Sequence, residues 1–268
     1  MTDIPPDRLH IAGRLGVTAR ITDGGVLLEL LPRPEVLQHG VVRISVLSFL
    51  VDAVAGIEVD TDPDAWALTS DMSVRMRPLP APERIEALGS VVRQGRRSTT
   101  SKVELFTEKS EPIATGAIGF AMLPRREGDP PKPNLTPQGA TTIFSGHRSL
   151  GGPLREVAGI ERIDPANGQV EVVVTPELRN PAGTLQGAMV ALLAEAAAED
   201  LVSTRFAVPV VVTELDLRYL AQARNGPVRT RCRLLGTDRD SPVEVELVDT
   251  ELDRITTLVY ARATALSA

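Results

Sequence analysis

The stretch NPAGTLQGAMVALLAEAAAED, residues 180–200, predicts a buried helix preceded by a turn. Its Ala, Leu, Val and Met residues leave nearly no polar side, and a helix that is apolar all round is buried. A lone carboxylate inside such a helix must find a partner, lose its charge or do chemistry. Glu195, at the centre of the run, is therefore a candidate functional residue.

The start of this helix carries two further candidates. Asn180 lies fifteen residues before Glu195, in the turn NPAG, and Gly187 lies eight residues before it. A glycine at a helix start lets a ligand approach backbone N–H groups at the positive end of the helix dipole. Such a position can hold a developing oxyanion, so Asn180, Gly187 and Glu195 are candidate catalytic residues.

Each of these residues also has a purely structural interpretation. Asn180 and Gly183 are typical of a turn that caps a helix, and a glycine such as Gly187 permits close helix packing. Glu195 could lie on a solvated face together with its neighbours Glu199 and Asp200.

A shift of 143 positions aligns much of the first half of the chain with the second. Positions that coincide under this shift carry the same or a similar residue: Gly16 and Gly159, Gly40 and Gly183, Asp52 and Glu195, Arg96 and Arg239. Asp52 is the only charged residue in the apolar run VLSFLVDAVAG, which makes it the fourth candidate catalytic residue. The chain is therefore expected to be two copies of one design.

Each copy presents a strand, an apolar helix and then four segments with alternating apolar and polar residues. The four segments span residues 65–79, 83–95, 99–109 and 112–123 in the first copy, and 210–222, 226–238, 241–251 and 254–266 in the second. This order predicts an α+β fold in which a curved antiparallel sheet wraps around one helix. The helices are expected to begin near Val41 and Thr184.

The copies correspond to predicted domains at residues 1–123 and 153–268. The segment 124–152 between them is rich in proline and glycine, which cannot sustain a helix or a central strand, so we interpret it as a linker.

Composition excludes several classes of protein. The 268 residues carry a formal net charge of −6, which argues against an extended surface for nucleic acid or an anionic membrane. The N-terminus lacks a signal-peptide pattern and no stretch is long enough to span a bilayer, so a cytoplasmic protein is expected. The sequence has no G-x-S-x-G, P-loop or G-x-G-x-x-G motif, and its three His residues lack metal-ligand spacing.

The arrangement of these motifs resembles the hotdog-fold acyl-CoA thioesterases of the 4-hydroxybenzoyl-CoA and phenylacetate-pathway type. Asn180, the QGA of residues 186–188 and Glu195 match the family's loop Asn or Gln, helix start and acid, and LDLRYLAQA of residues 215–223 resembles its next strand. Gln186 stands where the family often has a His, which makes it a candidate substrate-binding residue. The first copy departs further, with Leu37 in place of the loop Asn and RIS (residues 43–45) at the helix start.

The resemblance implies two tandem hotdog domains packed as a pseudo-dimer that hydrolyses an acyl-CoA thioester to free acid and CoA. The carboxylate acts as general base or as nucleophile, and no metal or redox cofactor is needed. The implied partner is acyl-CoA, without nucleic acid or membrane, and assembly of pseudo-dimers into a homo-oligomer stays open. With 3% aromatic residues, the pocket is expected to favour an aliphatic acyl group.

Helix geometry restricts how the site is assembled. Eight residues separate Gly187 from Glu195 by about 12 Å along a helix axis, so one thioester carbonyl does not reach both. A site must then combine the helix start of one copy with the acid of the other, as the resembled family does across a dimer. We expect Asn180 and Gly187 to act with Asp52, and Glu195 to face the poorer helix start at Ile44.

Arginine side chains are expected to bind the phosphates of CoA through their bidentate fork. The candidates are Arg96, Arg97, Arg218 and Arg239.

Two other functions remain in competition with hydrolysis. Hotdog hydratases and dehydratases resemble the chain in fold but use an acid paired with a His near the helix, a position occupied here by Gln186 or Arg43. A non-catalytic acyl-CoA-binding protein would account for the altered helix start of the first copy. Thiol release across acyl-CoAs separates these alternatives from a thioesterase.

Overall fold

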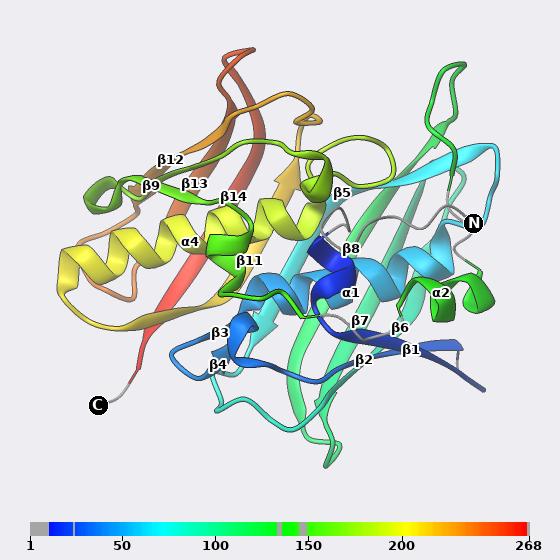
Figure 1. The fold of residues 1–268 in the computed structure, drawn as a ribbon, viewed down its shortest axis with the longest axis horizontal. Coiled ribbons are helices and arrows are strands. Elements are labelled where there is room, and N and C mark those ends of the chain that lie inside the picture. Colours follow the sequence, from blue (N-terminus) through cyan, green and yellow to red (C-terminus); the bar gives the residue numbers. More distant parts are fainter. Residues whose placement is uncertain (1–10, 24, 133–135, 145–148, 267–268) are drawn as a thin grey trace.

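The computed structural model describes residues 11–23, 25–132, 136–144 and 149–266. Its main feature is one antiparallel sheet of twelve strands, in the order β1-β2-β6-β7-β8-β5-β11-β14-β13-β12-β10-β9 (Figure 1). The strands are β1 (Val17–Thr22), β2 (Gly25–Leu30), β5 (Ala65–Met76), β6 (Ile85–Gln94), β7 (Ser98–Thr107), β8 (Pro112–Pro124), β9 (Glu161–Asp164), β10 (Gln169–Val172), β11 (Val210–Tyr219), β12 (Val228–Leu234), β13 (Val243–Asp249) and β14 (Arg254–Ala265). β3 (Leu37–Gln38) and β4 (Val41–Val42) form a separate hairpin. The antiparallel sheet expected from the alternating segments is confirmed.

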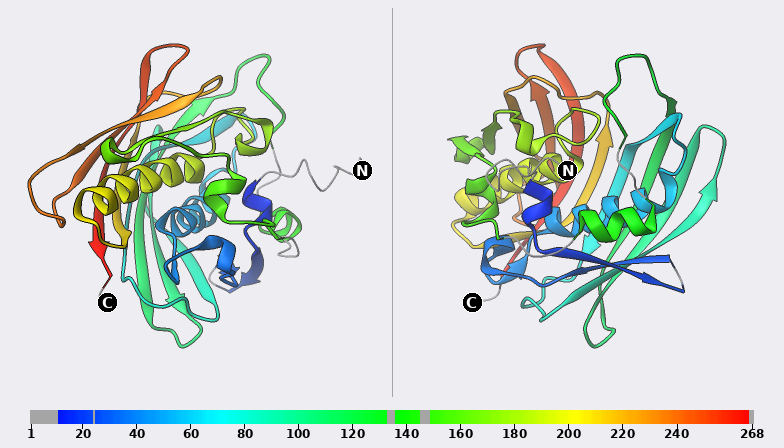
Figure 2. Two further views of the ribbon diagram at one scale, coloured as in Figure 1. Left: turned by 60° about the vertical axis from the view of Figure 1, so that its left-hand side comes forward. Right: turned by 45° about the vertical axis from the view of Figure 1, so that its right-hand side comes forward.

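Two long helices lie on one face of this sheet. They are α1 (Ile44–Val59) and α4 (Gly187–Phe206), and they pack against each other as well as against the strands (Figures 1 and 2). Residues 188–202 of α4 are buried without interruption, as its apolar composition predicts. The described residues also form two short α-helices, α2 (Pro137–Ile143) and α3 (Leu154–Val157), and short 3-10 helices at Ile11–Arg14, Pro34–Val36, Pro165–Asn167 and Pro176–Leu178.

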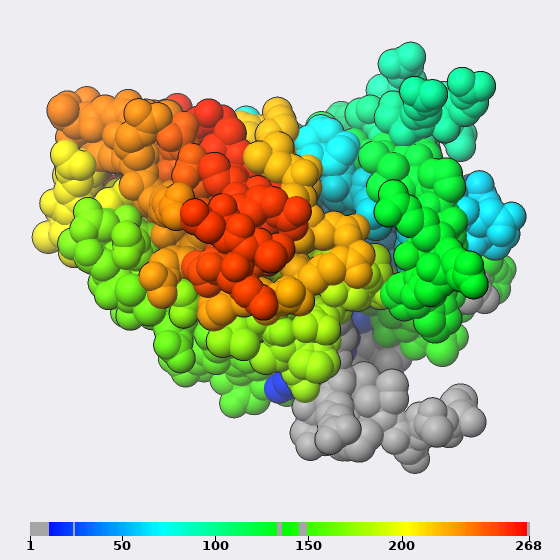
Figure 3. Space-filling view, turned by 90° about the horizontal axis from the view of Figure 1, so that it is seen from above, coloured from blue at the N-terminus to red at the C-terminus, as the bar shows by residue number. Residues whose placement is uncertain are grey.

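The two copies occupy equivalent places in the sheet. β5 pairs with β11 at the centre, and outward from this pair each copy adds its strands in the same order. Ser73 pairs with Asp216, which is its equivalent under the shift of 143 residues, so an approximate twofold axis passes between them. In the space-filling view from above, the strands of the first copy (cyan to green) and of the second (orange to red) lie on opposite sides (Figure 3).

Both long helices begin later than the sequence indicated. The expected starts were near Val41 and Thr184, whereas α1 begins at Ile44 and α4 at Gly187. Both segments first run extended, because Val41 belongs to β4 and the N–H of Leu185 donates 2.8 Å to the carbonyl of a neighbouring loop. Extended backbone before the helix leaves the first N–H groups of each helix pointing out of its end.

The expectation that the segment 124–152 holds no helix is wrong, because α2 lies within it. Its proline occupies the first helical turn, where the missing N–H removes no hydrogen bond, and the side chain of Thr136 accepts a hydrogen bond from the N–H of Gly139 at 3.2 Å. α2 packs against β1, and the N–H of Ala19 donates to the carbonyl of Phe144 at 3.1 Å. Part of this segment therefore covers the first domain.

Within the described ranges, no helix combines the length and the apolar character that crossing a membrane requires.

Candidate active site

Asp52 lies in the middle of α1 and is partly buried. Its Oδ1 accepts a hydrogen bond from the hydroxyl of Thr69, on β5, at 2.7 Å. Burial raises the pKa of Asp52 above its usual value, and the hydrogen bond from Thr69 opposes this increase. The carboxyl is thus moved toward the range in which a side chain takes up and releases protons near neutral pH.

The helix start of the second copy meets this acid. A Cβ atom on Gly187 would lie 3.5 Å from Oδ2 of Asp52 and 3.3 Å from the hydroxyl oxygen of Tyr219. The rise of a helix predicts that Gly187 and Asp52 come together from different copies, and the structure brings them together. Any side chain at position 187 would fill the space beside the carboxylate.

The first two N–H groups of α4 differ in whether they have a hydrogen-bond partner. Gln186 is buried, and its side-chain oxygen accepts a hydrogen bond from the N–H of Ala188 at 2.9 Å. Gln186 therefore caps the helix in the way that Ser, Thr and Asn do elsewhere. The N–H of Gly187, in contrast, has no hydrogen-bond partner in the part of the chain that the structure describes.

Asn180 holds the turn before α4. Its Oδ1 accepts a hydrogen bond from the N–H of Thr184 at 3.1 Å, and its own N–H donates to the carbonyl of Thr184 at 2.7 Å. These bonds close the turn before α4, as the structural interpretation of Asn180 requires, but the cap of the helix itself is Gln186. They engage the side-chain oxygen of Asn180 and leave its Nδ2 as the group that could donate to a ligand.

Glu195 reaches the start of α1, as the rise of a helix also predicts. Its carboxylate accepts hydrogen bonds from the N–H groups of Ile44 at 3.2 Å and Ser45 at 3.4 Å, and from the Ser45 hydroxyl. Arg43 lies 3.6 Å from Glu195 and 3.0 Å from Glu199. The carboxylate itself occupies the place at this helix end where a carbonyl oxygen would bind.

The charged cluster around Glu195 is fully enclosed. Arg43, Glu195 and Glu199 are 7%, 1% and 3% exposed, so the alternative of a solvated face is wrong. Burial raises the pKa of both carboxyls, and for Glu199, which also faces Glu195, the value is about 8. Because the helix N–H groups and Ser45 bind Glu195, we assign the negative charge to Glu195 and a proton to Glu199 at neutral pH.

The two equivalent positions thus differ through the length of one side chain. Glu195 is one methylene longer than Asp52 and fills its helix start, whereas Asp52 stops short of Gly187 and bonds to Thr69 instead. Only the Asp52 position leaves a helix N–H and a carboxylate available to the same ligand. We call it the open position, and the start of α1, which Glu195 fills, the closed position.

The four candidate arginines do not gather around this site. Arg96 and Arg97 lie in the β6–β7 turn and Arg239 in the β12–β13 turn, which the sheet order separates by five to six strand spacings, roughly 25–30 Å along the sheet. Arg218 precedes Tyr219 on β11, and since successive side chains of a strand point to opposite faces, it lies on the face away from the helices. The structure therefore distributes them over the turns and the outer face of the sheet.

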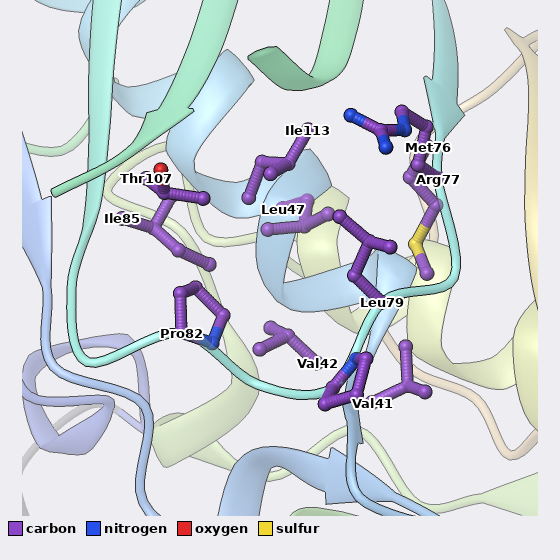
Figure 4. A pocket seen from close by; sticks show the side chains of 11 residues that line it. Val41, Val42, Leu47, Met76, Arg77, Leu79, Pro82, Ile85, Thr107 and Ile113 are labelled. Atoms are coloured by element: carbon purple, nitrogen blue, oxygen red, sulfur yellow. The ribbon is translucent and has the colours of Figure 1, made fainter. Parts of the chain in front are cut away.

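One cavity lies beside the start of α1, near the closed position. It measures about 30 Å³, and its lining includes Leu47, Met76 and Ile113 (Figure 4). This volume corresponds to about one water molecule and is too small for an acyl chain.

Sequence reasoning missed two polar residues that contact the Asp52 position, Thr69 and Tyr219. Alternation along the strands predicts which residues face the helices, but not which of them reach the carboxylate. For Tyr219 one signal was available, because the repeat aligns this residue with Met76, an exchange of an apolar for a hydrogen-bonding side chain.

Comparisons with known proteins identify the fold. No family model matches the sequence, and no curated protein sequence matches it. Many solved structures resemble the whole chain, and three of them serve as examples. A TesB protein of Mycobacterium avium subs paratuberculosis has 9% identity and a TM-score of 0.62, and the match covers 96% of this chain and 98% of that one. A putative oleoyl thioesterase from Lactobacillus plantarum has 11% identity and a TM-score of 0.61, and the match covers 95% of this chain and 100% of that one. A protein of unknown function with the hotdog fold from Alicyclobacillus acidocaldarius has 11% identity and a TM-score of 0.58, and the match covers 97% of this chain and 99% of that one. The likeness at these identities establishes that this chain has the hotdog fold.

Proposed function

We propose that this chain is a tandem double-hotdog thioesterase that hydrolyses an acyl-CoA to free acid and CoA at one site, formed by Asp52 and the start of α4. The observation that carries the proposal is the approach of Asp52 to Gly187 across the two copies, with Oδ2 3.5 Å from the position of a Cβ on that glycine. The pairing of Ser73 with Asp216 on an approximate twofold axis supports the tandem arrangement. One of the structural neighbours described above is named as a putative oleoyl thioesterase, which favours thioester chemistry on this fold.

The proposed reaction assigns a role to Gly187, Asn180 and Asp52. The thioester carbonyl accepts a hydrogen bond from the N–H of Gly187, where the dipole of α4 stabilises the developing oxyanion, and Nδ2 of Asn180 donates a second bond. Asp52 takes a proton from a water molecule that attacks the carbonyl carbon, or attacks it directly to form an anhydride that water then cleaves. In either route the C–S bond breaks and the thiolate of CoA leaves as a thiol after protonation.

A single active site per chain is the second part of the proposal. Glu195, with Arg43 and Ser45, satisfies the start of α1, and a thioester carbonyl would have to displace an ion-paired and hydrogen-bonded carboxylate. Removing that carboxylate from its partners would leave a buried charge without compensation. We therefore assign a structural role to the Glu195 cluster and the chemistry to Asp52.

CoA is proposed to bind along the surface by its phosphates at one of the two hairpin turns, either that of Arg96 and Arg97 or that of Arg239. Charge-removing changes at Arg96, Arg97 or Arg239 should raise KM more than they lower kcat, and most at low salt. The same change at Arg218, on the outer face, serves as a control for surface charge in general.

Thiol release measured across short, medium, long and aromatic acyl-CoAs, and across acyl carrier protein thioesters, tests the proposal. We expect turnover of an aliphatic acyl-CoA by the wild-type chain, loss of turnover in Asp52→Asn, and retention of most turnover in Glu195→Gln. Saturable CoA binding without thiol release from any substrate would contradict catalysis. Loss of turnover in Glu195→Gln with full activity in Asp52→Asn would place the site at Ile44.

A further inference from the structure

Tyr219 ends β11 and points toward the first turn of α4. Its hydroxyl donates a hydrogen bond to the carbonyl of Gly187 at 3.2 Å. The same hydroxyl oxygen lies 3.3 Å from the position that a Cβ on Gly187 would occupy, and Oδ2 of Asp52 lies 3.5 Å from that position. A phenol oxygen and a carboxylate oxygen therefore flank one small space, on the side of the helix start that carries no side chain.

The equivalent position in the first copy has no such group. Under the shift of 143 residues Tyr219 corresponds to Met76, which lines the small apolar cavity beside the start of α1. A thioether is at best a weak acceptor and donates nothing. The chain thus has a tyrosine at the helix start that Asp52 faces and a methionine at the one that Glu195 fills. The difference coincides with the difference between the open and the closed position.

We propose that Tyr219 is a positioning residue that orients the attacking water toward the thioester held at Gly187. The water donates one hydrogen bond to Asp52 and the other to the hydroxyl oxygen of Tyr219, whose own proton is directed to the Gly187 carbonyl. With both of its protons engaged, the water presents a lone pair to the carbonyl carbon. The inference rests on the thioesterase function proposed above.

The balance of the step is simple. The water oxygen forms the new C–O bond, the proton shared with Asp52 passes to that carboxylate, and the proton shared with Tyr219 stays with the product acid. The C–S bond breaks, and the sulfur receives the proton that Asp52 carries. Burial and the negative charge of Asp52 raise the pKa of Tyr219 well above its usual value, so the phenol stays neutral and keeps its donor and acceptor roles.

Tyr219→Phe removes the oxygen and keeps the ring. We expect kcat to fall roughly ten- to a hundredfold, with KM little changed, because the thioester is still bound but the water is no longer oriented. Tyr219→Met, which copies the residue of the first copy, should have the same effect and serves if the Phe variant does not fold. Tyr260→Phe is the matched control, because Tyr260 is the other tyrosine of the chain and is 39% exposed.

A second readout separates the positioning of water from support of the helix. With methanol added, hydrolysis and methanolysis compete, and the ratio of methyl ester to free acid reports the advantage of the positioned water. Loss of that advantage in Tyr219→Phe should raise the ratio. A lower kcat with an unchanged ratio would mean that Tyr219 only holds the start of α4, and an unchanged kcat would also overturn the proposal.

The experiments distinguish a wrong role for Tyr219 from a wrong proposed function. If the wild-type chain releases no thiol from any thioester, both fall. If the wild-type chain is active and Asp52→Asn is not, while Tyr219→Phe keeps full activity and the wild-type product ratio, only the role of Tyr219 is refuted.

Discussion

The substitution Glu199→Gln tests the claim that a buried charge cluster, and not a substrate site, occupies the start of α1. In the folded chain Glu199 has a pKa of about 8, against an ordinary value of 4.5. At neutral pH the folded chain therefore binds a proton that the unfolded chain has released. Glutamine resembles the protonated carboxyl in shape, and its amide oxygen can accept the hydrogen bond that Arg43 donates to Glu199 at 3.0 Å.

The sign and size of the effect follow from proton linkage. The raised pKa stabilises the wild-type fold fully below pH 4.5, and this contribution is lost as the pH rises to about 8. The loss has a limiting slope of about 1.4 kcal/mol per pH unit. Between pH 5 and pH 8 the wild-type chain should thus lose up to about 4 kcal/mol relative to Glu199→Gln, which does not titrate there.

Urea denaturation followed by circular dichroism, at several pH values from 5 to 9 and constant ionic strength, measures this difference. The two proteins should have similar free energies of unfolding near pH 5, and the variant should become the more stable one as the pH rises. Glu104→Gln, at a side chain that is 54% exposed, is the control and should change little at any pH. A difference between wild type and Glu199→Gln that stays constant with pH would refute the assignment of the proton to Glu199.

Three further predictions concern the open site. Asp52→Asn should lower kcat by roughly a hundred- to ten-thousandfold, the range of general acid–base catalysis, in a thiol-release assay in which Glu195→Gln loses much less. Thr69→Val removes the hydrogen bond that opposes the raised pKa of Asp52, so the acid limb of the kcat/KM profile should move to higher pH, while Thr69→Ser leaves it in place. Gly187→Ala puts a methyl group 3.3 Å from the Tyr219 hydroxyl and 3.5 Å from Asp52, so kcat/KM should fall in a chain that stays folded. Gly56→Ala, a helical position with no atom within 4 Å of the new methyl group, should keep activity and gain about 0.5–1 kcal/mol in urea denaturation.

The sequence predicted the broad arrangement because two simple periodicities determine it. Alternating segments predicted the eight long strands β5–β8 and β11–β14, and the shift of 143 residues predicted that the copies correspond position by position. The rise of a helix predicted that Gly187 and Glu195 belong to different sites, which the contacts of both residues agree with. The strands, the correspondence of the copies and the separation of Gly187 from Glu195 all depend on backbone geometry, and the spacing of residues along the sequence is enough to predict them.

The state of each helix start could not be predicted in the same way. Asp52 and Glu195 are chemically alike, and the difference between an open and a filled position depends on one methylene and on which polar groups lie within 3.5 Å. Thr69 and Tyr219 come from strands far from the helix starts in sequence, so no local motif marks them. The helix α2 was missed because proline was counted as a helix breaker without regard to its place in the first turn.

The pairing of β5 with β11 has a consequence for how such a protein can change. In a dimer of identical chains every substitution appears twice, so a carboxylate that fills one helix start fills the other and leaves no site. At the twofold axis the same constraint would set two aspartates, or two serines, against each other. Here Ser73 donates a hydrogen bond to Asp216 at 2.5 Å, a pair that two identical chains cannot form at their axis. Because the copies are joined in one chain, the two helix starts can carry different residues. Glu195 can then stabilise the start of α1 with buried charge, while Asp52 leaves space for a ligand at the start of α4.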